Sequence, residues 1–161
     1  MHTSFIGIKT AQSPRTFELW EEFLTDTDFR RIIEIGTYKW GMSLFFFLWC
    51  KTKQAQFYTY DIKFFPMTRV LRELEVKKCF REVDVFEEEK EIAELIEKAG
   101  ITILFCDGGD KARELNTFSK YLKRGDFIVV HDWGTEVFEH QVPSFLQLYD
   151  GDEITKIFQY A

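Results

Sequence analysis

Cysteine is scarce in this sequence: only Cys50, Cys79 and Cys106 occur among 161 residues, and no CxxC spacing joins them. An odd number of cysteines without paired spacing argues against a disulfide framework or a zinc site. Each of the three lies inside an apolar run, so we expect buried, reduced thiols.

Long hydrophobic segments are also missing. The longest apolar run, residues 42–50, is interrupted by Ser43 and is far shorter than the ~20 residues that a bilayer span needs. The N-terminus lacks the basic stretch, hydrophobic segment and cleavage site of a secretory signal. We therefore expect a cytoplasmic protein without a membrane partner.

Positive charge is in deficit, with 21 Lys and Arg against 27 Asp and Glu, a net charge of −6 and a pI near 5.2. Binding to phosphate backbones needs clustered Lys and Arg, so nucleic acid is disfavoured as a partner. The 45% of apolar residues, including eighteen Phe, suffice for one globular domain over residues 1–161, with a helical lead-in over residues 1–28.

Short β-rich runs alternate with helical periods along the chain. The expected strands are residues 31–35, 56–61, 80–85, 101–106, 127–130 and 154–160. One expected helix begins at Pro14. The other expected helices span residues 41–51, 66–75, 87–99, 112–122 and 142–149. This alternation predicts an α/β fold, a Rossmann-like three-layer sandwich with a mostly parallel sheet. We expect about six strands, and in one interpretation the usual last strand is absent.

Acidic residues stand at the end of each of the first five expected strands: Glu34, Asp61, Asp84, Asp107 and Asp132. Each of them alone is an ordinary turn or helix-capping residue. Ligands of open parallel sheets bind beyond the carboxyl ends of the strands, so the whole series favours a binding site there.

The loop after the first strand restricts the ligand. Met42 stands where a P-loop needs lysine, and Tyr38 stands where a dinucleotide fingerprint needs glycine. Nucleoside triphosphates, NAD and FAD are therefore disfavoured. A nucleoside-type ligand remains, and Asp61, 25 residues beyond Gly36, is placed to accept both ribose hydroxyls.

Residues 33–38, followed by Gly41 and Ser43, resemble the first motif of class I S-adenosylmethionine-dependent methyltransferases. The similarity is strongest to the small branch of the cephalosporin hydroxylase and macrocin O-methyltransferase groups. Residues 104–109 and 121–132 are similar to that branch as well, so the resemblance covers about residues 30–135.

This resemblance implies a loop that holds the methionine part of S-adenosylmethionine. Gly36 would let the backbone pass close to it, and Glu34 would hold its ammonium group directly or through water. Thr37, Tyr38 and Ser43 belong to the same predicted binding loop.

The resemblance also implies a nucleoside subsite. Asp61 would bind the ribose and Ile62 would pack on the adenine. Asp84 and Val85 would hold the amino edge of the adenine.

The predicted catalytic end contains Asp107 and Gly108, which would lie near the sulfonium. If the methyl acceptor is a hydroxyl, Asp107 and Asp132 could hold Mg²⁺ through carboxylate oxygens. Alternatively His131 is the general base, since an imidazole titrates near neutral pH; His140 is a second candidate for that role.

The function predicted from the resemblance is O-methyl transfer to a small-molecule or sugar hydroxyl. A non-catalytic cofactor-binding or assembly module on the same fold is the alternative, and a different nucleoside enzyme is a third. Only residues 1–28 and 133–153 remain to build a substrate cap. The acceptor could therefore be large, or a second copy of the chain could complete the site as a homo-oligomer.

The assignment of Asp61 is directly testable. Asp61→Ala should weaken cofactor affinity by about 2 kcal/mol or more, because charged hydrogen bonds to the ribose are lost. Calorimetric titration with S-adenosylhomocysteine measures the effect, and an unchanged dissociation constant would remove Asp61 from the site.

Overall fold

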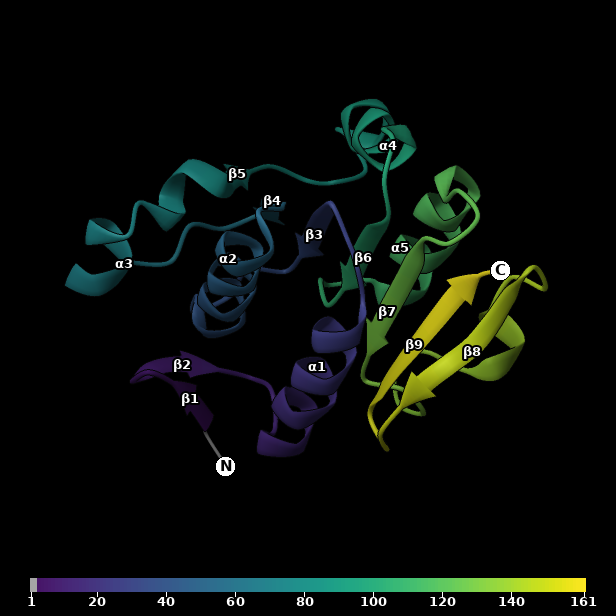
Figure 1. Ribbon diagram of the computed structural model, residues 1–161, viewed down its shortest axis with the longest axis horizontal. Coiled ribbons are helices and arrows are strands. Elements are labelled where there is room, and N and C mark those ends of the chain that lie inside the picture. Colours follow the sequence, from purple (N-terminus) through teal and green to yellow (C-terminus); the bar gives the residue numbers. More distant parts are fainter. Residues whose placement is uncertain (1–2) are drawn as a thin grey trace.

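A seven-stranded sheet runs through the centre of the computed structural model, which describes residues 3–161 (Figure 1). Its order is β5-β4-β3-β6-β7-β9-β8. The parallel strands are β3 (Arg31–Ile35), β4 (Gln56–Asp61), β5 (Phe80–Glu82), β6 (Thr102–Cys106) and β7 (Phe127–His131). β9 (Thr155–Tyr160) and β8 (Leu146–Gly151) complete the sheet with antiparallel pairing. The α/β class and the mostly parallel sheet are thus confirmed.

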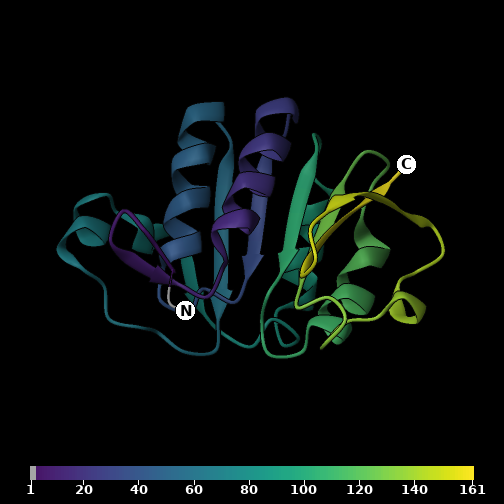
Figure 2. The ribbon, with the colours of Figure 1, turned by 90° about the horizontal axis from the view of Figure 1, so that it is seen from below.

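Helices cover both faces of the sheet. α1 (Pro14–Asp26) and α2 (Gly41–Lys53) lie side by side on one face (Figure 2), and α4 (Glu89–Glu97) and α5 (Lys111–Phe118) pack on the other. The short elements are α3 (Arg69–Glu73), η1 (Val76–Cys79), η2 (Ser119–Tyr121) and η3 (Glu139–Gln141). Because both faces are covered, β3, β6 and β7 are buried at every position.

Local sequence signals explain where two of these helices begin. Ser13 caps α1, accepting a hydrogen bond from the backbone N–H of Thr16 at 3.2 Å, and Pro14 takes the first helical position. Asp110 caps α5 in the same way, with the N–H of Arg113 at 3.1 Å from its Oδ1. The second cap starts α5 directly beyond the end of β6.

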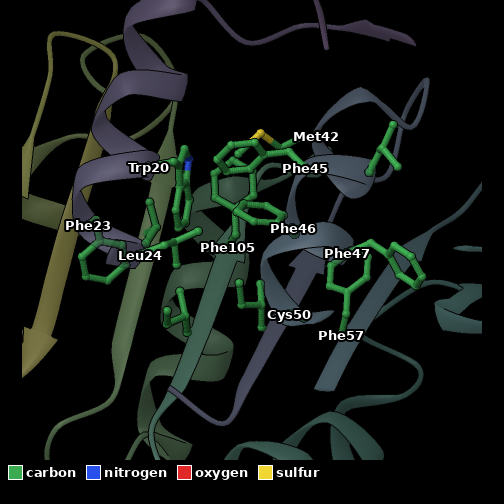
Figure 3. Close-up of a cluster of buried hydrophobic side chains, with 14 of the residues drawn as sticks. Trp20, Phe23, Leu24, Met42, Phe45, Phe46, Phe47, Cys50, Phe57 and Phe105 are labelled. Atoms are coloured by element: carbon green, nitrogen blue, oxygen red, sulfur yellow. The ribbon is translucent and has the colours of Figure 1, made fainter. Parts of the chain in front are cut away.

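The core between the sheet and the first helix pair is aromatic (Figure 3). Trp20 of α1 meets Phe46 of α2 and Phe105 of β6 edge-on, with ring centroids 4.7 and 5.2 Å apart. Edge-to-face contacts stabilise the core beyond what the burial of these large rings alone contributes. Cys50 and Cys106 are buried and Cys79 is half-buried, and all three are free thiols.

One predicted helix is wrong. Residues 142–149 do not form a helix: β8 runs over part of this range and pairs antiparallel with β9, so the sheet has seven strands and its last strand is present. Asp152 holds the turn between the two strands, because its Oδ1 accepts hydrogen bonds from the N–H groups of Ile154 and Thr155. The pairing with β9 overrides the local apolar pattern.

The N-terminal lead-in is only partly helical. A hairpin of β1 (Thr3–Phe5) and β2 (Ile8–Thr10) precedes α1, whereas residues 1 and 2 lie outside the described part of the chain. The hairpin lies against the first turn of α2, since a Cβ on Gly41 would collide with the carbonyl of Lys9. Within residues 3–161, every helix is too short or too polar to cross a bilayer.

The ends of β3 and β6 approach each other so closely that only glycine fits at position 36. Gly36 has φ +98°, and a Cβ there would overlap the carbonyl oxygen of Asp107. Gly36→Ala should therefore lower the free energy of unfolding by at least about 2 kcal/mol. Gly109→Ala is the matched control, because open space surrounds that position. Urea unfolding compares the two variants, and equal losses would contradict the interpretation.

Candidate functional site

A cavity of about 650 Å³ opens at the carboxyl edge of the parallel strands. Loops that follow β3, β4, β5, β6 and β7 all contribute to it. The predicted site residues that line it are Gly36, Tyr38, Asp61, Ile62, Asp84, Val85, Asp107, Gly108, His131 and Asp132. The volume falls within the range typical of small-molecule sites.

The loop after β3 is held in an unusual backbone conformation. Tyr38 and Trp40 both have positive φ, 48° and 74°, which costs free energy in residues other than glycine. The N–H of Tyr38 donates to Asp61 Oδ2 at 2.9 Å, and the N–H of Lys63 donates to Asp61 Oδ1 at 3.0 Å. Both oxygens of this carboxylate are therefore fixed in place at the cavity wall.

Three predicted cofactor residues are buried and do not line the main cavity: Glu34, Thr37 and Ser43. Glu34 is fully buried, and its Oε2 accepts hydrogen bonds from Ser43 at 2.5 Å and Thr59 at 2.6 Å. Thr37 and Thr59 join their hydroxyls at 2.6 Å. Burial raises the pKa of Glu34 to about 8, although the two hydroxyl hydrogen bonds oppose the shift.

The cavity wall beyond β4 and β5 is largely apolar. Ile62 is exposed, whereas Val85 is buried at the cavity wall. The Asp84 carboxylate accepts a hydrogen bond from the N–H of Phe86 at 2.9 Å. The guanidinium of Arg113 lies over the Phe86 ring, 3.7 Å from the ring centroid. Apolar side chains beside a fixed carboxylate form a wall suited to a flat heterocycle with an amino edge.

The carboxyl ends of β6 and β7 bring together the predicted catalytic residues. His131 Nδ1 lies 3.3 Å from Asp107 Oδ1 and 3.2 Å from Asp132 Oδ1. Donor atoms of Asp107, His131 and Asp132 lie within 4.8 Å of one another, as metal ligands would. Burial alone would lower the pKa of His131, but the two carboxylates outweigh it and raise the pKa. A raised pKa favours the protonated ring, which cannot accept a further proton.

Lys111 is a member of this cluster that the sequence interpretation missed. Its ammonium lies 2.8 Å from Glu136 Oε2, 3.0 Å from Asp132 Oδ2 and 3.7 Å from Asp107 Oδ1. Burial opposes the charge, yet hydrogen bonds with Glu136 and Asp132 raise the pKa of Lys111. The Asp132 pKa is lowered, because contacts with Lys111 and His131 outweigh burial. The position of Lys111, four residues after a strand-end aspartate, was the available signal.

Two more residues that contact the site come from elements that the motif does not cover. Gln12, from the segment before α1, donates from Nε2 to Asp107 Oδ2 at 2.6 Å. Glu114 of α5 accepts the N–H groups of Gly108 and Asp110, and burial raises its pKa to about 7. His140, the second candidate base, stacks on Phe138 outside the cavity.

Comparisons with known proteins identify structures that have a similar fold. No protein-family model matches the chain, and no curated protein matches it. A structure of CmcI described as Mg-SAM is similar over 81% of this chain, with a TM-score of 0.62 and 18% identity. The chain spans 57% of the length of that structure.

Two further structures are similar over nearly the whole chain. A CmcI structure described with SAH matches over 98% of this chain and 81% of its own, with a TM-score of 0.67 and 13% identity. An RNA methyltransferase from Salinibacter ruber, in complex with S-adenosyl-L-homocysteine, matches over 94% and 92%, with a TM-score of 0.51 and 14% identity. The chain therefore has the Rossmann-like fold of class I methyltransferases.

The buried carboxyl beneath the loop makes a pH-dependent prediction. The pKa of Glu34 is about 8 in the folded protein against 4.5 as its ordinary value, so the folded state holds the proton more tightly. The stability gained in this way is complete below pH 4.5 and is lost as the pH rises through 8. Glu34→Gln keeps a hydrogen-bond acceptor but does not titrate.

Urea unfolding should therefore show a pH-dependent difference between the wild type and Glu34→Gln. We expect the wild type to lose on the order of 4 kcal/mol relative to the variant from below the lower pKa to above the upper one. Titration of Glu114 occurs in both proteins and cancels in the difference. A difference that is constant with pH would mean that Glu34 is already ionised in the fold.

Proposed function

We propose that this protein is an S-adenosylmethionine-dependent methyltransferase that transfers a methyl group to a hydroxyl of a small molecule or a sugar. The distribution of groups along the cavity carries the proposal. β3, which leads into Gly36, lies between β4, which ends in Asp61, and β6, which leads into Asp107. The cavity thus has a nucleoside side and a reaction side, with the glycine loop between them.

The nucleoside side has the groups that a ribose and an adenine need. The Asp61 carboxylate is held by two backbone N–H groups, and its remaining lone pairs can accept two ribose hydroxyls. Ile62 and Val85 offer apolar contacts to the adenine. The Asp84 carboxylate can accept a hydrogen bond from the amino group of the adenine.

The methionine end is supported by an unpaired buried atom. Gln12 is 2% exposed, and its Oε1 has no hydrogen-bond partner among the described residues. Gln12 also lines a small crevice with Gly36 and Thr37, next to the main cavity. An ammonium group there would satisfy this acceptor. We therefore propose Gln12, and not the more deeply placed Glu34, as the direct partner of the cofactor's ammonium.

S-adenosylmethionine supplies an electrophilic methyl group on a sulfonium when it is bound, so the protein mainly aligns the acceptor and excludes water. Asp132 lines the cavity, and its side chain is 34% exposed. We assign its carboxylate to hold the acceptor's hydroxyl and take the proton. His131 Nδ1 and the Lys111 ammonium contact this carboxylate and orient it.

Competitive binding is the first test of the proposed function. Isothermal titration calorimetry with S-adenosylhomocysteine, NAD and ATP should give measurable binding only for S-adenosylhomocysteine. Preferred binding of NAD or ATP would contradict the assignment of the loop after β3. Cofactor binding without methyl transfer to any hydroxyl acceptor would favour the non-catalytic module.

Asp132→Asn separates chemistry from binding. We expect transfer of labelled methyl groups to a panel of sugar and phenolic hydroxyls to fall about a hundredfold or more, because the proton acceptor is lost. The dissociation constant of S-adenosylhomocysteine should change little. Glu139→Gln, at an acid of η3 outside the cavity, is the matched control and should keep full activity. Undiminished transfer by Asp132→Asn would refute this role.

A further inference from the structure

The cluster at the ends of β6 and β7 already contains a cation. Lys111 is the first residue of α5, and its side chain is 7% exposed. Its ammonium donates to the Gly108 carbonyl at 3.0 Å and to Glu136 Oε2 at 2.8 Å, and it lies 3.0 Å from Asp132 Oδ2. An ammonium has three N–H donors, so these three oxygens satisfy it completely.

The same oxygens are the ones that a divalent ion would use. Carboxylate and carbonyl oxygens are the ligands of Mg²⁺ and Ca²⁺, and Asp107, His131 and Asp132 have donor spacing compatible with a metal. Lys111 lies within 4 Å of both Asp107 and Asp132. A divalent ion bound to these two carboxylates would therefore sit beside a buried ammonium that repels it.

We propose that the Lys111 ammonium takes the place of a divalent metal ion in the cluster of Asp107, Asp132 and Glu136. Lys111 balances the carboxylates and fixes their orientation, which are two of the tasks of a bound ion. Its donors are used within the protein, so the third task, polarising the acceptor's hydroxyl, falls to the Asp132 carboxylate. The catalytic part of this inference rests on the proposed methyl transfer, whereas the part on metal binding does not.

Direct metal titration tests the inference without cofactor or acceptor. Mn²⁺ binding, followed by electron paramagnetic resonance and calorimetry, should not saturate at the cluster in the wild-type protein. Lys111→Met removes the charge and keeps much of the side-chain volume. This variant should gain Mn²⁺ affinity of at least about tenfold, and Asp132→Asn in the same background should abolish the gain.

Lys63→Met is the matched control, because Lys63 lines the same cavity outside the cluster. It changes the net charge equally and should leave Mn²⁺ binding unchanged. An equal gain in both variants would show that total charge, and not the position of Lys111, limits metal binding. Saturable Mn²⁺ binding by the wild type, lost in Asp132→Asn, would overturn the proposal.

Stability measurements keep the test decisive if Lys111→Met unfolds. Glu136→Gln combined with Lys111→Met removes one carboxylate together with the ammonium and restores part of the charge balance. Mn²⁺ should raise the Tm of this double variant and leave the Tm of the wild type unchanged. A rise in the wild-type Tm that EDTA reverses would contradict the proposal.

In the methyltransfer assay the wild type should keep its activity in EDTA. Loss of activity in EDTA, with wild-type Mn²⁺ binding in the titration, would refute the role of Lys111 and leave methyl transfer intact. Failure of S-adenosylhomocysteine to bind would refute the proposed function and leave the metal titration interpretable. The two proposals therefore fail separately.

Discussion

The contact between Gly36 and the carbonyl of Asp107 is the constraint on which the site depends. β3 is hydrogen-bonded to both neighbours at this edge. The N–H of Gly36 donates to the backbone carbonyl of Tyr60 at 2.8 Å, and the N–H of Asp107 donates to the Ile35 carbonyl at 3.0 Å. A side chain at position 36 would push β6 away and open the sheet where its ladder ends. The loop that carries Tyr38 and the aspartate that faces Lys111 are thus held in one rigid frame.

Two carboxyl groups close to this frame, those of Glu34 and Asp132, are stabilised in different ways. Glu34 is buried beneath the loop, and the only hydrogen-bond partners of its side chain among residues 3–161 are hydroxyl groups. Burial raises its pKa, which favours the neutral carboxyl. At the cavity wall, Asp132 has cationic partners and its pKa falls. One carboxyl therefore supports the structure as a mostly neutral group, whereas the other remains a charged group available to a ligand. The difference comes from the partners and not from the residue type.

Much of the fold was accessible from the sequence, and the reasons are local. β6 and β7 are apolar at nearly every position and are followed by turn residues, which identifies buried parallel strands. β8 was missed because Leu146 is its one buried residue, so no periodicity shows that it pairs with β9. The hairpin before α1 was missed for a related reason, since two three-residue strands are too short to carry a pattern. Both elements are recognised only from their pairing with a neighbouring strand.

The sequence by itself determined that the parallel strands end in acidic residues and that a glycine loop follows the first of these strands. These features determine the edge of the sheet at which the cavity opens. These features follow from hydrophobic pattern and turn chemistry, which act over a few residues. Only the tertiary structure decided that Gln12 reaches Asp107 and that Lys111 meets Asp132 and Glu136. These contacts join segments far apart along the chain, and their strength depends on burial and distance, which no local pattern of residues encodes.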